Sequence, residues 1–175
     1  MEISHFSQEL FLRDGTPVLI RAIRPDDKQH LSEGFHHLSG QSIYFRFFRR
    51  KKDLTEDELR DLTEVDFNHH VAIVVTLLNR GEEDGIGVGR YIELKDNDSE
   101  RVAEIAFAVE DEFQGLGVGT ILLEQLTIFA QQQGIKRLVA DVLLDNKAMM
   151  RMLKNCGFNL ETTVDNGIAH IEFNI

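Results

Sequence analysis

The sequence predicts an α/β or α+β domain built on a sheet of meander type. Residues 102–109 are apolar or small apart from Glu104, as in a buried strand. Three glycines at alternate positions follow this strand, and residues 121–133 then show the spacing of a helix. Three consecutive strand-like segments after an early group of helices favour a sheet of meander type.

The N-terminal segment predicts a β-hairpin. Residues 1–8 carry no clear pattern, so we expect a loose arm there. Residues 10–13 and 17–23 are largely apolar and lie on either side of Asp14-Gly15, a pair typical of a hairpin turn.

Three helices are predicted next. Pro25 and the two acids after it suit a first helical turn, because proline tolerates that position and acids favour a helix N-terminus. Residues 43–48 predict a second helix that is unusually aromatic, and its rings suit a core better than a ligand site. Thr55 and Glu58 form a capping box that starts the third helix.

The rest of the chain predicts strands, one further helix and a closing hairpin. Valine and isoleucine dominate the strand segments, and Gly134 ends the helix that follows the glycines. The predicted elements are strands at 71–78 and 86–94 joined by a turn over 81–85, an acidic connection over 93–99, a strand at 136–144, a helix from Asp145-Asn146, and a hairpin of 158–163 and 168–173.

The composition indicates one globular domain of 175 residues, with 42% hydrophobic and 28% charged residues. The net charge of −11 argues against a nucleic-acid partner and would attract cationic substrates such as amines. The single cysteine, Cys156, excludes an internal disulfide framework and a multi-cysteine metal site, and we expect a cytoplasmic protein. We find no signal peptide and no apolar run of membrane-spanning length.

The histidines predict no metal site. His36-His37 and His69-His70 are adjacent pairs. Neighbouring residues on an extended segment face opposite sides of a sheet, so such a pair cannot easily chelate one ion.

The glycine loop reads Gln114-Gly115-Leu116-Gly117-Val118-Gly119 and opens a helix. Glycines let the backbone approach an anion closely, and the free N–H groups of the helix start point at it, so the expected ligand is a phosphate or pyrophosphate. A dinucleotide fold would need glycine where Thr120 stands, and a P-loop would need Gly-Lys-Ser/Thr. A turn that only packs the helix against the strand is the structural alternative.

The pattern Gln114-x-x-Gly117-x-Gly119, after the strand segment 103–107, resembles the coenzyme A loop of the GNAT superfamily of N-acetyltransferases. Residues 142–158, VLLDNKAMMRMLKNCGF, resemble the strand-to-helix element of that superfamily that ends in Gly-Phe. Segments 12–16, 20–27, 44–48 and 62–66 resemble the acetyltransferase domain of bacterial Pat-type protein lysine acetyltransferases. The resemblance implies a GNAT-like fold, in which helices flank a mixed, mostly antiparallel central sheet.

The resemblance also implies a set of residues that bind acetyl-CoA. The backbone at Phe107, Ala108 and Val109 would pair with the pantetheine arm, and Asn146 would lie near it. The amides that would hold the pyrophosphate are those of Gln114, Gly115, Leu116, Gly117, Val118, Gly119 and Thr120.

Glu104 falls where several GNAT enzymes place a general base, and an extended segment puts it on one face with Ala106 and Ala108. A lysine-like ammonium has a pKa of about 10.4, so only about a thousandth is free amine near neutral pH, a deficit of about 4 kcal/mol. A carboxylate can take that proton directly or through water. The structural alternative is an acid paired with Arg101 or another cation.

One position departs from the family pattern. Many GNAT proteins have a tyrosine five residues before the phenylalanine of the final Gly-Phe, where it protonates the leaving thiolate, but Leu153 stands there. A thiol pKa of about 8.5 makes a tolerable leaving group without an acid. Cys156 is expected to be a small core residue, since no histidine partner is evident.

The predicted function is an acetyl-CoA-dependent N-acetyltransferase that modifies a primary amine, with a protein lysine as the preferred acceptor. A small amine, such as a polyamine or an amino acid, fits the same catalytic strand. A noncatalytic acyl-CoA-binding sensor is the alternative of another class, and a nucleotide-dependent oxidoreductase is more distant.

Overall fold

The computed structural model describes residues 2–79, 82–94 and 100–175. The strands are β1 (Ser7–Phe11), β2 (Pro17–Ala22), β3 (His70–Asn79), β4 (Glu82–Glu93), β5 (Val102–Val109), β6 (Arg137–Leu143), β7 (Glu161–Asp165) and β8 (Ile168–Asn174). The helices are α1 (Lys28–His37), α2 (Gly40–Phe47), α3 (Glu56–Thr63), α4 (Val118–Gln132) and α5 (Lys147–Lys154), with short 3-10 turns at Ile3–His5, Pro25–Asp27 and Asp111–Phe113.

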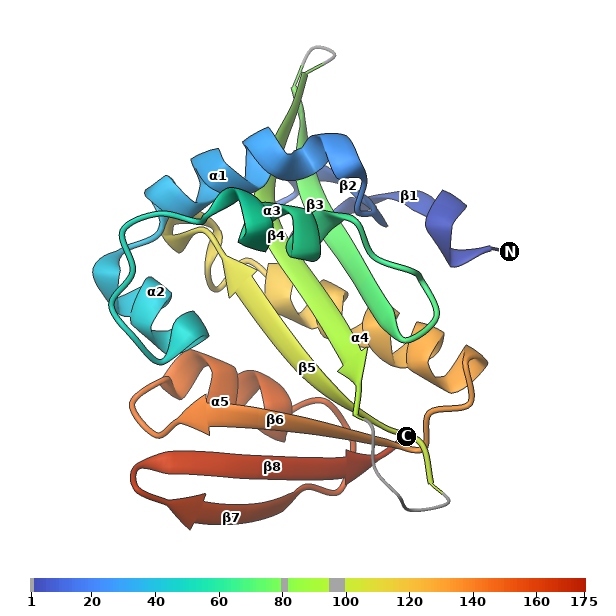
Figure 1. Cartoon of the computed structure of the whole chain (residues 1–175), viewed down its shortest axis with the longest axis vertical. Helices are drawn as coiled ribbons and strands as arrows, with labels where there is room; N and C mark the ends of the chain where they lie inside the picture. Colours follow the sequence, from blue (N-terminus) through green and yellow to red (C-terminus); the bar gives the residue numbers. More distant parts are fainter. Residues whose placement is uncertain (1, 80–81, 95–99) are drawn as a thin grey trace.

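The strands form one sheet in the order β1-β2-β3-β4-β5-β6-β8-β7, with the pair β5–β6 parallel and the other described pairs antiparallel. Helices α1 and α3 lie on one face of this sheet and α4 lies on the other (Figure 1). The structure therefore confirms the predicted mixed, mostly antiparallel sheet flanked by helices.

The two faces of the sheet carry buried hydrophobic clusters of different size. On the α4 face, Leu122 and Leu126 pack with Val71, Ile73 and Val75 in a large buried cluster. On the opposite face, the buried cluster comprises Ile23, Ala72 and Val74, with a few partly buried neighbours from the helices and loops. Since this second cluster is small, it leaves room for a cavity beneath α1.

Two glycines of β4 let α4 approach the sheet closely. A Cβ at Gly87 would lie 2.6 Å from Cγ1 of Val118, and a Cβ at Gly89 would lie 3.0 Å from Cδ1 of Leu126. Side chains at these positions would push α4 outward. The glycines therefore fix the start of α4 against the middle of the sheet.

The structure confirms three predictions that rest on short sequence patterns: a strand, a helix cap and a hairpin turn. The strand predicted at 102–109 is β5. In the capping box of α3, the Thr55 hydroxyl accepts a hydrogen bond from the Glu58 N–H, and the Glu58 carboxylate accepts one from the Thr55 N–H. Asn166 and Gly167 have positive φ angles of 47° and 81°, as the predicted hairpin turn between β7 and β8 requires.

The prediction of a loose arm over residues 1–8 is wrong for residues 2–8, which the structure describes. Ile3 is buried in the core, and β1 pairs with β2 from Ser7 onward. The side chains of β1 are mostly exposed, so backbone pairing rather than an alternating apolar pattern holds this strand. Its sequence therefore carries little of the signal on which strand prediction depends.

The predicted turn over 81–85 is also wrong where the structure describes it. Glu83, Asp84 and Gly85 belong to β4 and pair with β3, next to a register shift between Val75 and Thr76. The glycine at 85 therefore marks an irregularity of the strand rather than its end. Residues 80–81, and residues 95–99 of the predicted acidic connection, lie outside the described residues.

A buried ion pair joins β2 to the turn before α1. The Arg21 guanidinium donates to both carboxylate oxygens of Asp27 at 2.7 and 2.8 Å, and its Nε donates to Glu83 at 2.6 Å. Arg21 and Asp27 are 2% and 3% exposed. Burial alone would raise the pKa of Asp27, but hydrogen bonds from Arg21 and from the Arg24 N–H lower it below its ordinary value.

We expect Asp27→Asn to lower the free energy of unfolding by about 3 kcal/mol, because the buried Arg21 charge loses the paired hydrogen bonds of Asp27 and keeps only Glu83 as a carboxylate partner. Urea denaturation at neutral pH measures this loss. The exposed pair of Asp57 and Arg60 on α3 supplies the control, and Asp57→Asn should cost at most about 1 kcal/mol. Equal urea midpoints for Asp27→Asn and Asp57→Asn would contradict a stabilising role of the buried Arg21–Asp27 pair.

Candidate active site

Strands β5 and β6 separate soon after they begin. Their parallel ladder pairs Val102 with Arg137, Ala103 with Leu138 and Glu104 with Val139, and it ends there. Figure 1 shows the two strands diverging beyond this point. The sheet thus opens into a wedge, and we call this the β5–β6 gap.

Two residues of β5 turn their backbone groups toward the gap. The Glu110 N–H donates to the Ile86 carbonyl at 3.0 Å, and the Val102 carbonyl accepts from the Leu94 N–H at 2.8 Å. The even-numbered residues of β5 therefore direct their backbone N–H and C=O groups toward β4. By alternation, Phe107 and Val109 direct their N–H and C=O groups toward the gap.

Ala108 contributes to the site differently from its two neighbours. It lies opposite Val88, so its backbone groups face β4, while its side chain lines the pocket on the α1 face of the sheet. Of the three residues predicted to pair with pantetheine, the register therefore presents the backbone of two to the gap.

The glycine loop lies at the open end of the gap, directly after β5. Gly115 and Gly117 have φ angles of 80° and 101°, a region that favours glycine, and Gly117 caps the start of α4. The Ile121 N–H donates to the Gly117 carbonyl. The N–H groups of residues 118–120 precede this first helical bond and form the donor-rich start of the helix.

Arg13 holds the loop from the turn between β1 and β2. Its backbone N–H donates to the Leu116 carbonyl at 3.0 Å, and its Nη1 donates to the Gly115 carbonyl at 3.5 Å. A Cβ at Gly117 would lie 3.3 Å from the Arg13 Nε, so the guanidinium lies across the loop. Sequence analysis missed this cation because more than 100 residues separate it from the loop.

Gln114 links the end of β5 to α2. Its Nε2 donates to the Val109 carbonyl at 3.1 Å and to the Ser42 hydroxyl at 3.2 Å. The Ser39 N–H donates to the Asp111 carboxylate at 3.1 Å. These bonds hold the start of α2 beside the loop, next to the gap.

Asn146 lies on the other side of the open end, three residues after β6. Its side-chain oxygen accepts from the Met149 N–H at 3.1 Å and caps α5. A Cβ at Gly119 would lie 2.8 Å from the Met152 sulfur, so α5 also packs closely on the start of α4. The structure therefore brings Asn146 and the glycine loop to the same end of the sheet.

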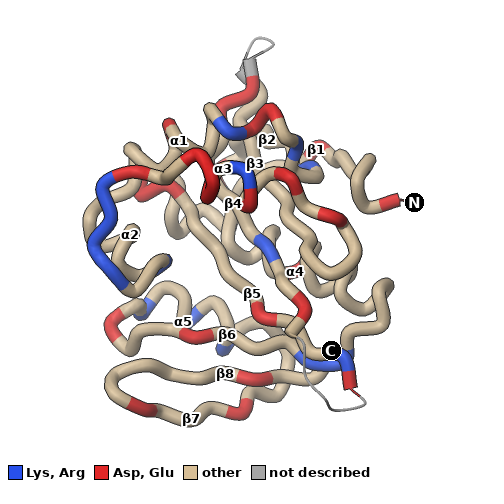
Figure 2. Tube along the Cα trace, viewed as in Figure 1, with Lys and Arg blue, Asp and Glu red and all other residues tan. Residues whose placement is uncertain are grey.

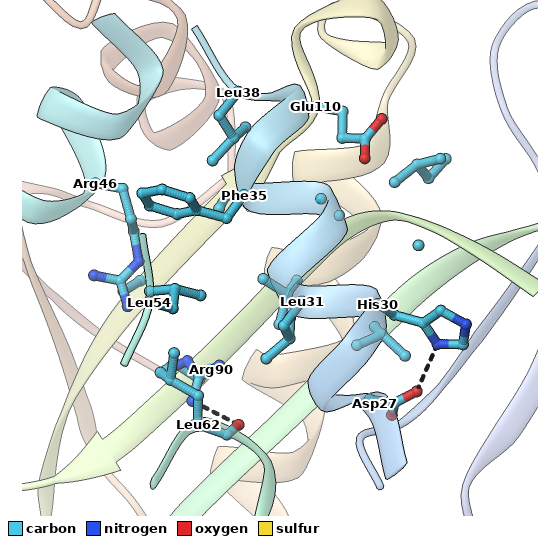
Figure 3. A pocket seen from close by; sticks show the side chains of 18 of the residues that line it. Asp27, His30, Leu31, Phe35, Leu38, Arg46, Leu54, Leu62, Arg90 and Glu110 are labelled. Atoms are coloured by element: carbon cyan, nitrogen blue, oxygen red, sulfur yellow. Dashed lines mark hydrogen bonds and ion pairs between the residues drawn. The ribbon is translucent and has the colours of Figure 1, made fainter. Parts of the chain in front are cut away.

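A pocket lies on the α1 face of the sheet, beside the gap (Figure 3). Its cavity volume is about 80 Å³. Apolar side chains of α1 and of its C-cap residue form one wall, among them Leu31, Phe35 and Leu38, and Ala106 and Ala108 of β5 form part of the floor. Arg46 of α2 and Arg90 of β4 also line it.

Glu104 lies at the narrow end of the gap, where the β5–β6 ladder ends. It is exposed and shares the face of β5 that carries Ala106 and Ala108. Its charge acts on Arg46, whose pKa is lowered by burial and partly restored by this carboxylate. Arg101, the cation considered as a structural partner for Glu104, instead binds Glu93 at 2.6 and 2.7 Å.

The two remaining candidate residues near α5 belong to the core. Leu153 is fully buried, so the position that many GNAT proteins fill with tyrosine offers a hydrocarbon side chain and no proton donor. Cys156 is partly buried and packs against the main core cluster.

Charge is unevenly distributed over the molecule. Figure 2 shows acidic residues spread over most elements, while basic residues gather in the segment after α2. In that segment Arg49 and Lys51 bind Glu58, and the hydrogen bond from Lys51 is the main reason that the Glu58 pKa falls to about 2. The basic segment is therefore partly neutralised by α3.

The described part of the chain has neither a metal-ion cluster nor a helix that could span a membrane. Residues 2–79, 82–94 and 100–175 contain no group of three or more His, Cys, Asp or Glu side chains arranged to hold a metal ion. Within the same ranges, no helix is both long and apolar enough to span a membrane.

Comparison with known proteins agrees with this geometry. Residues 38–158 match the model of the acetyltransferase (GNAT) family. An acetyltransferase of Pseudomonas aeruginosa is 29% identical over 147 residues, which cover 84% of this chain and 77% of that protein. The acetyltransferase Pat of Mycolicibacterium smegmatis is 32% identical over 146 residues, covering 83% of this chain and 42% of Pat.

Solved structures extend the likeness to the fold. The GNAT domain of PAT from S. lividans superposes with a TM-score of 0.88 at 28% identity, and each chain covers 97% of the other. The acetyltransferase yncA from Salmonella typhimurium, solved with acetyl-CoA, has a TM-score of 0.66 at 19% identity. The superposed region covers 90% of this chain and 92% of the yncA chain. A family model that matches most of the chain, together with these relatives, identifies the protein as a GNAT-family acetyltransferase.

Proposed function

We propose that this acetyltransferase moves the acetyl group of acetyl-CoA to a primary amine, and that the amine is a lysine side chain of a protein. The observation that carries the proposal is the β5–β6 gap, which has the glycine loop at its open end and Glu104 at its narrow end. The likeness to Pat and to the PAT domain supports a protein acceptor. Because this chain spans 42% of Pat, the likeness concerns that part alone.

In this proposal acetyl-CoA lies along the gap. The amide groups of its pantetheine arm would pair with the backbone of Phe107 and Val109, as an added strand would. The pyrophosphate would accept hydrogen bonds from the amides of residues 114–120, and the Arg13 guanidinium supplies a positive charge beside them. Asn146 would border the pantetheine from the β6 side.

The proposed reaction is a direct attack of the free amine on the thioester carbonyl. Glu104 would first take a proton from the ammonium form of the acceptor, directly or through water, and so give the free amine that attacks. Negative charge then develops on the carbonyl oxygen, and a backbone N–H directed into the gap, at Phe107 or Val109, would stabilise it. When the C–S bond breaks, coenzyme A leaves as a thiolate, and the extra proton on the new amide nitrogen passes to water. Leu153 has no proton to donate to the leaving thiolate.

A noncatalytic acyl-CoA sensor remains a second candidate because of the buried Leu153. It would bind acetyl-CoA without releasing coenzyme A in the presence of any amine. Calorimetry combined with a thiol-release assay over a panel of amines separates the two functions.

We expect purified protein and isotopically labelled acetyl-CoA to acetylate specific lysines when incubated with a deacetylated bacterial proteome. Mass spectrometry should find these sites labelled well above a control without the protein, which corrects for spontaneous acetylation. If every lysine stays at the control level while a small amine turns over readily, the acceptor is a metabolite and the protein-lysine proposal is wrong.

We expect Glu104→Gln to lower kcat by about a hundredfold at neutral pH, because the variant keeps the side-chain size but cannot accept the proton. The loss should shrink as pH approaches the amine pKa of about 10, where free amine needs no base. The Kd for acetyl-CoA should not change. Glu124→Gln, an exposed change on α4, is the matched control and should leave kcat unchanged. If kcat is also unchanged in Glu104→Gln, the general base is another group.

A further inference from the structure

Two arginines, Arg46 and Arg90, line the pocket on the α1 face of the sheet (Figure 3). Arg90 comes from β4 and is 4% exposed, and Arg46 comes from α2 and is partly buried. Both side chains line the same cavity as Leu31, Phe35 and Leu62. The proposed reaction above uses neither of them.

Within the described residues, neither arginine forms an ion pair with a carboxylate. The Arg90 Nη1 donates to the Leu62 carbonyl at 3.1 Å and contacts the His70 Nε2 at 3.1 Å. Arg46 lies 5.1 Å from the centre of the Phe47 ring. The buried Arg21, by contrast, has two carboxylate partners.

The groups that face the pair offset its charge only in part: the Glu104 carboxylate acts on Arg46 and partly restores its lowered pKa, but it forms no ion pair with Arg46 within the described residues. Burial, and then the charge of Arg90, lower the His70 pKa to about 4, so His70 is neutral at pH 7 and can accept the bond from Arg90. Burial, and then repulsion by Arg46, lower the Arg90 pKa to about 9. Asp27, His30 and Glu110 line other parts of the pocket, and Asp27 already binds Arg21.

An apolar cavity with two poorly compensated guanidinium groups favours an anion. Leaving such charges without partners in a water-poor site is costly, and a carboxylate can accept paired hydrogen bonds from a guanidinium. Placing an acidic group of a ligand here would therefore contribute both binding energy and orientation.

The position of the pair relative to Glu104 limits how far this anion lies from the reacting amine. Arg90 is directly opposite Ala106 on β5, and Glu104 is two residues from Ala106 on the same face. Diagonal neighbours in an antiparallel pair are about 7–8 Å apart. An amine at Glu104 and a carboxylate on the arginines would fit one small molecule or adjacent residues of one peptide.

We propose that Arg46 and Arg90 bind a carboxylate of the acceptor, so that preferred acceptors carry an acidic group next to the reactive amine. This inference rests on the proposed acetyl transfer and specifies its substrate class. In a protein acceptor, the carboxylate belongs to an Asp or Glu beside the modified lysine. In a free amino acid, it is the α-carboxylate.

The test compares kcat/KM for matched acceptors with wild type, Arg46→Gln and Arg49→Gln. One pair of lysine peptides differs only by Asp or Asn beside the lysine, and one pair of small acceptors consists of an amino acid and its amide. We expect wild type to prefer the carboxylate member of at least one pair by about tenfold or more, the worth of one charged contact. Arg46→Gln should reduce that preference to less than about threefold.

Arg49→Gln is the control because Arg49 belongs to the same basic segment but is exposed and binds Glu58. It should keep the wild-type preference. Arg46→Lys serves as a second variant if Arg46→Gln does not fold, and it should retain part of the preference because it keeps the charge.

The outcomes separate this inference from the proposed function. Preference in the peptide pair supports an acidic neighbour of lysine, and preference confined to the amino-acid pair supports a free amino acid as the source of the carboxylate. The inference is overturned if the two members of each pair have equal kcat/KM, or if Arg46→Gln keeps the wild-type preference. Either result leaves acetyl transfer itself standing. Acetyl-CoA binding without turnover of any acceptor would overturn the proposed function itself.

Discussion

The early end of the β5–β6 ladder is the constraint on which the rest of the site depends. Three residue pairs join these strands, and the sheet then opens. An opening inside a sheet leaves backbone donors and acceptors that normally pair with a neighbouring strand. In an acetyltransferase of this family, that row of backbone groups is suited to a ligand that also carries amides, and pantetheine is such a ligand.

The surrounding packing holds the opening in place. Gly87 and Gly89 bring α4 onto β4, so the glycine loop lies where β5 ends. Arg13 and Gln114 then bind that loop to the β1–β2 turn and to α2. On the opposite face, the small cluster around Ala72 and Val74 leaves room for the pocket that Arg46 and Arg90 line.

The sequence predicted the parts of this arrangement that depend on local chemistry. β5 was predictable because its residues are apolar or small apart from Glu104, and α3 because Thr55 and Glu58 satisfy each other's backbone within one turn. β1 was missed because its exposed side chains follow no apolar pattern. Arg13 and Arg90 were missed as site residues because their neighbours in the site are distant in sequence, and no local spacing marks that proximity.

Residue-resolved hydrogen exchange tests the central claim, that acetyl-CoA occupies the β5–β6 gap, most directly. On binding, the amide N–H groups of Phe107 and Val109 should become strongly protected, because they would gain hydrogen bonds to the ligand. The amides of Ala106 and Ala108 face β4 and should change little. Tight binding of acetyl-CoA without added protection at Phe107 and Val109 would contradict the account.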